Sequence, residues 1–354
     1  MNLDKLLDLL ACPVTGESLL FEPTGKDEGL LTSAAGQVYP VIGGVPRLLP
    51  PDLLGPFLRG AYPEVLKREP RLAAALRDAP EPEPEVLETL IAYSHQHLDL
   101  KDDLLLIDDW RLTWDRFQPG SSPESYSGRV VLEAGCGEGR HAYLVAPHAS
   151  ILVGLDLSRG VELSRLRDQS PTSFYVQADL RRPPFKPGVF DAFYSNGVLH
   201  HTPVPAESFA ACARLLRVGG KANIWVYGLE EMRLTYRLSH LTWLRPLTGR
   251  LPKRAQEALA VGMTAALEVG LWAPTRGLYG LGMTSLAERL PYHDAASRDF
   301  KYKKRRMFDR LNPPITFYPT QTELRGWYDG FDEVVVTNAD GQGWAVSGLK
   351  SKRL

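Results

Sequence analysis

The sequence has few cysteines and no sign of an export signal. Its 354 residues include three cysteines, at positions 12, 136 and 212, which are far apart in the chain. This number excludes both a disulfide framework and a four-thiolate metal site. Residues 1–5, Met-Asn-Leu-Asp-Lys, lack the basic head and the small-residue cleavage site of a secretion signal. A cytoplasmic location is therefore the default expectation.

Net charge and long apolar runs are also scarce. Lys and Arg number 41 and Asp and Glu number 42, so the formal net charge is −1. A chain so close to neutral has no overall field for nucleic acid or an anionic membrane, although a local patch can exist. The longest uncharged run, residues 29–46, is interrupted by glycine and proline, and we expect no stretch long and apolar enough to span a bilayer. The 44% hydrophobic and 23% charged residues are typical of a soluble globular chain of two or three domains.

Residues 1–50 are predicted to form a small module of their own. An amphipathic start is followed by Ala-Cys-Pro-Val-Thr-Gly at 11–16 and by Val-Tyr-Pro-Val-Ile-Gly-Gly-Val-Pro at 38–46. This pattern resembles the zinc-ribbon module known as the activator subunit of certain tRNA and protein methyltransferases. The ribbon's four ligand positions would fall on Cys12, Thr15, Thr32 and Ala35. One thiolate cannot hold tetrahedral zinc, so the resemblance extends to the scaffold and not to the metal.

Residues 51–127 are expected to form a helical linker and lid. A Pro/Glu-rich stretch, residues 79–85, separates two helices because proline is not tolerated in a helix interior. Further along, Trp110, Trp114 and Phe117 recur at i, i+4 and i+7, which places them on one face of a helix. We expect this face to pack against the rest of the domain.

Residues 128–228 alternate strand and helix signals. The predicted strands are residues 129–133, 150–155, 174–178, 191–196 and 222–227, the last following a turn at 218–221. The pattern resumes in residues 307–354, with a strand at 333–336 and an antiparallel strand at 344–349 expected to close the sheet edge. The prediction is an α/β fold of the Rossmann-like type, a seven-stranded, mostly parallel sheet with an antiparallel last strand. Ligands bind beyond the carboxyl ends of such strands.

A Gly-rich turn follows the first of these strands. It reads Glu133-x-Gly135-x-Gly137-x-Gly139, and Arg140 stands where a dinucleotide fingerprint would have its third glycine. A carboxylate at the strand end would repel a pyrophosphate but suits a ligand that carries an ammonium group. The turn therefore favours a cofactor with a positive charge over a dinucleotide.

Two more acids follow later strands. Asp156 lies 21 residues after Gly135, at a distance where a carboxylate can accept both hydroxyls of a ribose. Asp179 ends the third strand, where it can accept from an adenine amino group while the Leu180 amide donates to the ring.

This ordered set, with Ser-Asn-Gly-Val-Leu-His-His at 195–201, resembles a class I S-adenosylmethionine-dependent methyltransferase. The resemblance covers residues 105–228 and 315–350, and it implies S-adenosyl-L-methionine as the cofactor. It places the methionine end on Glu133 and the Gly turn, the ribose on Asp156, and the sulfonium beside Ser195 and Asn196. Asp191 is expected to cap its strand and not to bind the ligand. The complete cofactor-binding set is Glu133, Gly135, Cys136, Gly137, Gly139, Asp156, Leu157, Asp179, Leu180, Ser195 and Asn196.

The acceptor side is less specific in the sequence. His201, and less so His200, are candidates for the base that an acceptor hydroxyl or carbon acid needs, since the usual pKa of His suits proton removal. The alternative, which we prefer, is that both rings shape the loop and pack on the cofactor. Side chains of the preceding helices could also reach the cleft: Tyr93, His95, His97 and Tyr126.

Residues 229–306 are predicted to be a helical insertion that caps the acceptor pocket, with four large candidates for its lining: Trp243, Leu271, Trp272 and Tyr279. The basic run at 301–306 argues for RNA, but it is short and the chain is neutral. We therefore favour O-, N- or C-methylation of a small-molecule metabolite. Methylation of tRNA is the alternative, and a third reading is a cofactor-binding protein without catalysis.

The N-terminal module makes the first testable prediction. Metal analysis of the untagged, dialysed protein should find no stoichiometric zinc, because Thr15, Thr32 and Ala35 replace three thiolates. The module's apolar side chains must then supply the stability that coordination supplies elsewhere. One equivalent of bound zinc would contradict this.

Overall fold

Two compact units make up the chain in the computed structural model. The first combines Met1–Glu230 with Phe317–Leu354, and the second is Glu231–Thr316. The structure describes residues 3–99, 107–228, 230, 248, 251–339 and 343–352.

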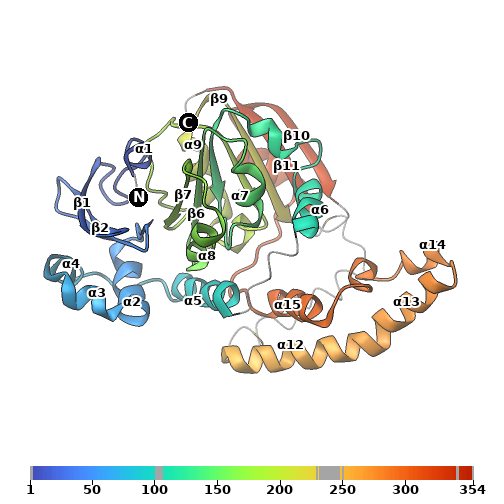
Figure 1. The fold of residues 1–354 in the computed structure, drawn as a ribbon. Coiled ribbons are helices and arrows are strands. Elements are labelled where there is room, and N and C mark those ends of the chain that lie inside the picture. The colour runs from blue at the N-terminus through green and yellow to red at the C-terminus, as the bar shows by residue number, and fades with distance from the viewer. Residues whose placement is uncertain are drawn as a thin grey trace. The chain divides into compact units, whose positions relative to one another are not determined.

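The first unit contains a seven-stranded sheet of order β10-β11-β9-β8-β5-β6-β7, which confirms the predicted fold class (Figure 1). Its strands pair in parallel from β9 through β7, and β11 alone runs antiparallel to its two neighbours. The central strands are almost fully buried, as expected where helices cover both faces of a sheet. The strand bounds are β5 (Val130–Ala134), β6 (Ile151–Asp156), β7 (Ser173–Gln177), β8 (Phe190–Asn196), β9 (Leu216–Tyr227), β10 (Phe331–Ala339) and β11 (Gly343–Lys350).

Two details of this sheet differ from the sequence prediction. The last strand, β11, does not close the sheet edge, because it lies between β9 and β10 and leaves β10 at the edge. The turn predicted at 218–221 lies within β9. Gly219 has a φ of +80° there, and the pairing with β8 shifts register between Phe190 and Ala192. A bulge therefore bends the strand where the glycines suggested a break.

The helices of the first unit position the site. The aromatic face of α6 is confirmed, since Trp110 and Trp114 are 2% and 1% exposed. The Trp114 ring packs edge-on against Tyr194 of β8, with centroids 5.3 Å apart. The helices that flank the sheet or precede it are α2 (Pro51–Ala61), α3 (Pro63–Arg68), α4 (Pro70–Ala75), α5 (Pro84–Asp99), α6 (Ile107–Phe117), α7 (Arg140–Val145), α8 (Gly160–Arg167), α9 (Pro205–Leu215) and α16 (Gln321–Trp327).

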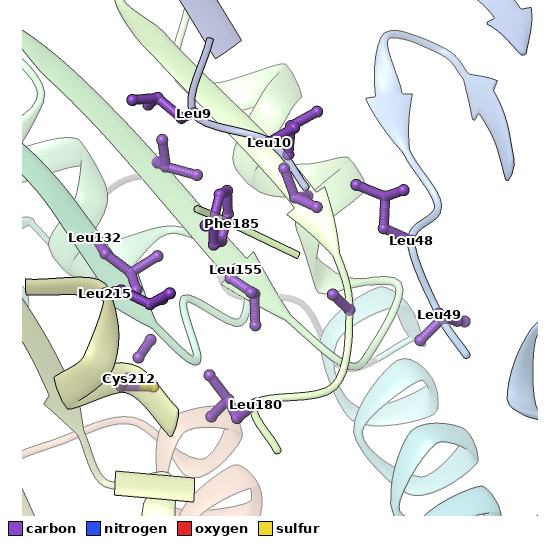
Figure 2. Close-up of a cluster of buried hydrophobic side chains, with 14 of the residues drawn as sticks. Leu9, Leu10, Leu48, Leu49, Leu132, Leu155, Leu180, Phe185, Cys212 and Leu215 are labelled. Carbon is purple, nitrogen blue, oxygen red and sulfur yellow. The ribbon is translucent and has the colours of Figure 1, made fainter. Parts of the chain in front are cut away.

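The N-terminal module is a short helix and a small antiparallel sheet of order β1-β2-β3-β4. Its core is continuous with that of the large sheet, as Leu10, Leu48 and Leu49 pack beside Leu155 and Phe185 (Figure 2). Backbone bridges extend this contact, from Leu10 to Phe185 and from Arg47 to Gln177. Apolar packing thus holds the module in place. Its elements are α1 (Asp4–Leu7), β1 (Leu19–Gly25), β2 (Glu28–Ser33), β3 (Val38–Ile42) and β4 (Val45–Pro46).

The second unit is helical. Trp272, a predicted lining residue of the acceptor pocket, is 3% exposed and donates its indole N–H to the Tyr292 carbonyl, so it belongs to the core of this unit. Trp243, another predicted lining residue, lies outside the described residues. The helical segments are α12 (Lys253–Leu267), a π-helical turn (Glu268–Trp272), α13 (Ala273–Gly280), α14 (Thr284–Ala287) and α15 (Phe300–Leu311).

The basic run lies on α15 and faces its own unit. Lys303 and Arg305 are 2% and 4% exposed. The Lys303 ammonium donates to Glu268 at 2.7 Å, and Arg306 pairs with Asp294 at 2.8 Å. Half of the run's side chains are thus engaged inside the unit, which weakens the argument for RNA.

One helix corrects the expectation about membrane spans. The continuous helix Lys253–Gly280 has 28 residues. An 18-residue stretch of it has a mean hydropathy of 1.2 and is 22% buried, so by length and composition the helix could cross a bilayer. Glu268 interrupts its uncharged run, but Lys303 and Arg276 pair with that carboxylate. Core helices of globular proteins meet the same criteria of length and composition, and no membrane role follows from them.

The start of α16 gives a prediction about stability. Thr320 and Glu323 form a capping box, in which the hydroxyl accepts from the Glu323 amide and the carboxylate accepts from the Thr320 amide. Thr320→Ala should lower the free energy of unfolding by about 1 kcal/mol in urea titrations. The exposed neighbour Thr322 makes no cap contact, so Thr322→Ala is the matched control. Equal losses in the two variants would contradict this.

Candidate active site

The Gly-rich turn is closely packed where β5 ends. Gly135, Gly137 and Gly139 all have positive φ, at +87°, +53° and +80°, which side chains rarely adopt. A Cβ on Gly135 would lie 2.4 Å from Val198, and one on Gly137 would lie 2.9 Å from the His97 ring. The turn is joined to the next strand, because the amides of Gly135 and Cys136 both donate to the Leu155 carbonyl. Glycine is therefore required for conformation and for space.

Asp156 at the end of β6 fixes this turn. Its Oδ2 accepts from the Gly137 amide at 2.8 Å, and its Oδ1 accepts from the amide and hydroxyl of Ser158. Oδ2 therefore has room for one ribose hydroxyl, and the other hydroxyl could bind Oδ1 by displacing a Ser158 donor. Leu157, which follows, directs its carbonyl to the side-chain amide of Gln177.

Glu133 is buried behind the turn. Its side chain is 2% exposed, and its Oε2 has no hydrogen-bond partner within the part of the chain that the structure describes. Burial raises the pKa of Glu133 well above its usual value, and the nearby Asp156 carboxylate adds to the rise. Such a group is poised to accept a cationic ligand, since a positive charge would restore its ionised form.

Asp179, the acid expected to bind adenine, already accepts hydrogen bonds from an arginine. Both oxygens of Asp179 accept from the Arg181 guanidinium, and Arg181 also reaches Glu83 at 2.8 Å in the segment before α5. An adenine amino group would have to share this carboxylate with Arg181. Leu180 is 5% exposed and contributes to the apolar core beside it.

Ser195 and Asn196 end β8, and neither side chain is isolated. The Ser195 hydroxyl donates to the Ala134 carbonyl at 2.8 Å and is fully buried. The Asn196 carbonyl oxygen accepts from Gln118, and its amide contacts His141 Nδ1 at 3.2 Å. Asp191 at the other end of this strand holds the Val130 amide, as expected. Side-chain hydrogen bonds therefore tie β8 to β5, to α7 and to the residues after α6.

The two histidines after β8 differ in their surroundings. His200 is fully buried, and its Nδ1 accepts from the Tyr227 amide at 3.4 Å. His201 is 9% exposed and lies 5.8 Å from the Tyr93 ring, centroid to centroid. His201 is thus the more accessible of the two candidate bases.

Helix α5 brings further residues to the turn. Tyr93 and His97 stack on each other, and the His97 ring lies against Gly137 and Gly160. Sequence analysis named both rings but could not orient them, and it missed Ser94, whose hydroxyl accepts from the Arg159 amide. Tyr93 and Ser94 precede His97 by four and three residues. This spacing places each of them on the same helix face as His97, and it was the signal that the sequence offered. Tyr126, the other aromatic candidate, instead bonds Asn223 in the core.

Comparison with known proteins agrees with this geometry. Residues 132–224 match the family profile described as a methyltransferase domain. This range runs from β5 into β9 and contains the Gly turn, Asp156 and the two histidines.

The curated relatives include tRNA-modifying enzymes. The chain is 36% identical over 107 residues to a tRNA (carboxymethyluridine(34)-5-O)-methyltransferase of Xenopus tropicalis, covering 29% of this chain and 16% of the relative. It is 31% identical over 121 residues to a tRNA U34 carboxymethyltransferase of Hydrogenovibrio crunogenus, covering 32% of this chain and 35% of the relative. A probable S-adenosylmethionine-dependent methyltransferase of Mycolicibacterium smegmatis is 29% identical over 195 residues, covering 50% of this chain and 72% of the relative. The chain thus spans about a third or less of the two tRNA-modifying relatives.

His141 connects the site to a pH prediction. Its Nδ1 faces the Asn196 amide and its Nε2 faces the Thr113 hydroxyl at 3.2 Å, while that hydroxyl donates to the Trp110 carbonyl. This pattern fits a neutral ring with the proton on Nε2. Burial lowers the pKa of His141 from 6.5 to about 3.

Because the folded-state pKa lies below the unfolded value, the unfolded chain binds the proton first as the pH falls. The free energy of unfolding should decline between pH 6.5 and 3, with this group contributing about 1.4 kcal/mol per pH unit. In urea unfolding of the wild type and His141→Gln at several pH values, the variant should show a shallower decline. His148→Gln, at a side chain that is 30% exposed, is the control for replacing a histidine outside the buried site. Identical slopes for wild type and His141→Gln would refute the assignment.

Proposed function

Residues 132–224 form an S-adenosylmethionine-dependent methyltransferase domain, and we propose that the protein uses it to methylate a small, uncharged acceptor that contains a planar group. The observation that supports the cofactor end best is Glu133, a buried carboxylate with one oxygen lacking a hydrogen-bond partner in the described residues. A cofactor with an ammonium group would pair with it, and a dinucleotide would not.

The chain's own residues do the work of binding and alignment. Bound S-adenosylmethionine supplies an activated methyl group, so the protein has mainly to orient an acceptor toward it. Glu133 would take the ammonium, and Asp156, already oriented by the Gly137 amide, would take the ribose hydroxyls. The His97 ring of α5 lies against Gly137 with Tyr93 stacked on it, and the two rings would exclude water from the turn.

The acceptor side is aromatic. His201 lies 5.8 Å from the rings of both Tyr93 and Tyr227, and Tyr227 stacks on Tyr318 with centroids 5.9 Å apart. Aromatic walls favour planar, uncharged molecules. His201, at the centre of these rings, is the proposed base for an acceptor that must lose a proton, and His200 is the weaker candidate.

Transfer to tRNA is the second candidate, and the named relatives favour it. Against it, half of the side chains in the basic run of α15 are engaged within its unit. The two candidates separate in a single assay: methyl-labelled cofactor is incubated with protein and a cell extract that has been split into small-molecule and RNA fractions. Label in the small-molecule fraction supports our proposal, and label in the RNA fraction alone overturns it. His201→Phe, which keeps a ring at this position, shows whether label transfer needs the imidazole.

Glu133 gives the prediction for cofactor binding. Its pKa is raised by burial, and pairing with an ammonium group lowers the pKa of a carboxylate. Binding of S-adenosylhomocysteine, which keeps the ammonium, should therefore release up to about one proton near neutral pH. Calorimetry in buffers of different ionisation enthalpy measures this release.

Glu133→Gln is the matched variant, since it keeps the shape but cannot ionise. It should bind more weakly, by about 1–3 kcal/mol, and release no proton. Equal proton release by the wild type and this variant would show that Glu133 does not hold the ammonium. Tight binding of NAD in place of S-adenosylhomocysteine would overturn the cofactor assignment.

A further inference from the structure

A buried arginine joins the N-terminal module to the cofactor domain. Arg47 follows β4 directly and is 1% exposed, although it carries a full charge. Its Nη1 donates to Gln177 Oε1 at 2.9 Å, and its Nη2 lies 3.1 Å from Glu162. Placing a guanidinium in a protein interior is costly unless its charge and donors are met. Both partners belong to the large sheet and its helices, Gln177 to β7 and Glu162 to α8.

Gln177 connects Arg47 to the loop after β6. It is fully buried, and its Nε2 donates to the Leu157 carbonyl at 2.9 Å. A guanidinium has donors only, so it must face the oxygen of the Gln177 amide. The nitrogen is then turned toward Leu157. Arg47 thus dictates which way the amide points, and the amide in turn holds the residue that follows Asp156.

The neighbouring backbone reinforces this arrangement. The Leu48 amide donates to the Gln177 carbonyl at 2.8 Å, and the Ala178 amide donates to the Asp156 carbonyl at 3.0 Å. Leu48 also packs into the shared apolar core (Figure 2). Gln177 is therefore fixed on its main chain as well as its side chain, and little freedom remains for the loop.

The far side of the loop is held by the same cluster. Arg159 donates to Glu162 at 2.9 Å, and the Tyr62 hydroxyl donates to Glu162 at 2.6 Å. The Arg159 amide is bonded to Ser94 of α5. Glu162 thus connects Arg47 of the module to Arg159, three residues after Asp156.

We propose that Arg47 is a positioning residue for the cofactor: through Gln177 it fixes Leu157 and with it the Asp156 carboxylate that takes the ribose. The N-terminal module is then a working part of the cofactor site and not only an attached scaffold. This inference rests on the proposed function, since it assumes that Asp156 binds the ribose of S-adenosylmethionine.

Gln177→Glu is the sharpest test. The new carboxylate still accepts from Arg47, but it can no longer donate to the Leu157 carbonyl. Calorimetry with S-adenosylhomocysteine, performed well below the thermal midpoint of each variant, should show a Kd about tenfold higher than that of the wild type. Arg47→Met should weaken binding to a similar extent, and Arg47→Lys should restore part of it. Arg71→Met removes an exposed ion pair with Glu22 and leaves the path from Arg47 to Leu157, so its Kd should stay within about twofold of the wild type.

A second comparison separates positioning from general loosening. If Arg47 acts through Asp156, Gln177→Glu should cost little further affinity once Asp156 has been changed to Asn, because both substitutions act on one contact. Losses that multiply in the double variant would overturn the inference, as would wild-type affinity in both Gln177→Glu and Arg47→Met. A wild-type protein that does not bind S-adenosylhomocysteine would instead overturn the proposed function.

Discussion

One hydrogen bond organises the candidate site, from the Gly137 amide to the Asp156 carboxylate. It connects the turn after β5 to the end of β6, so the groups expected to hold the methionine and ribose ends share one rigid frame. The positive φ values of the three glycines make this approach possible, because a side chain on Gly135 would collide with Val198. The buried Glu133 lies behind this frame, and α5 lies across it.

Much of this frame could be predicted from the sequence. Strand ends, acids and glycines are local features, and the apolar runs located the strands to within a residue or two, except where β9 begins and where β10 ends. The position of β11 between β9 and β10 could not be predicted, because strand order depends on long-range pairing that no local pattern encodes. Gly219 and Gly220 suggested a turn between two elements. In the structure they belong to a bulge, and β9 continues through them.

The contacts that support the site were harder to foresee. Gln177 and Arg47 are 130 positions apart, and each is an ordinary polar residue in its own segment. Only the packing of the module against β7 gives them a joint role. The same holds for the basic run of α15, whose burial depends on Glu268 and on the Trp272 core. Trp272 itself was predicted to line a pocket, but a large apolar ring serves a helical core equally well.

The N-terminal module shows how a small antiparallel sheet can be stabilised by packing. Cys12 lies 3.4 Å from the Tyr39 hydroxyl in a buried setting, and Leu19, Val38 and Ile42 are each below 9% exposed. This core merges with that of the large sheet, so the module is stabilised by the domain that it supports.

The central claim is that the Gly turn, Glu133 and Asp156 together bind S-adenosylmethionine. The most direct measurement is a crystal structure of the protein with S-adenosylhomocysteine. It should show the ammonium group within hydrogen-bond distance of Glu133 and both ribose hydroxyls on Asp156. A ligand bound elsewhere, or one whose ammonium group and ribose contact neither carboxylate, would contradict this account.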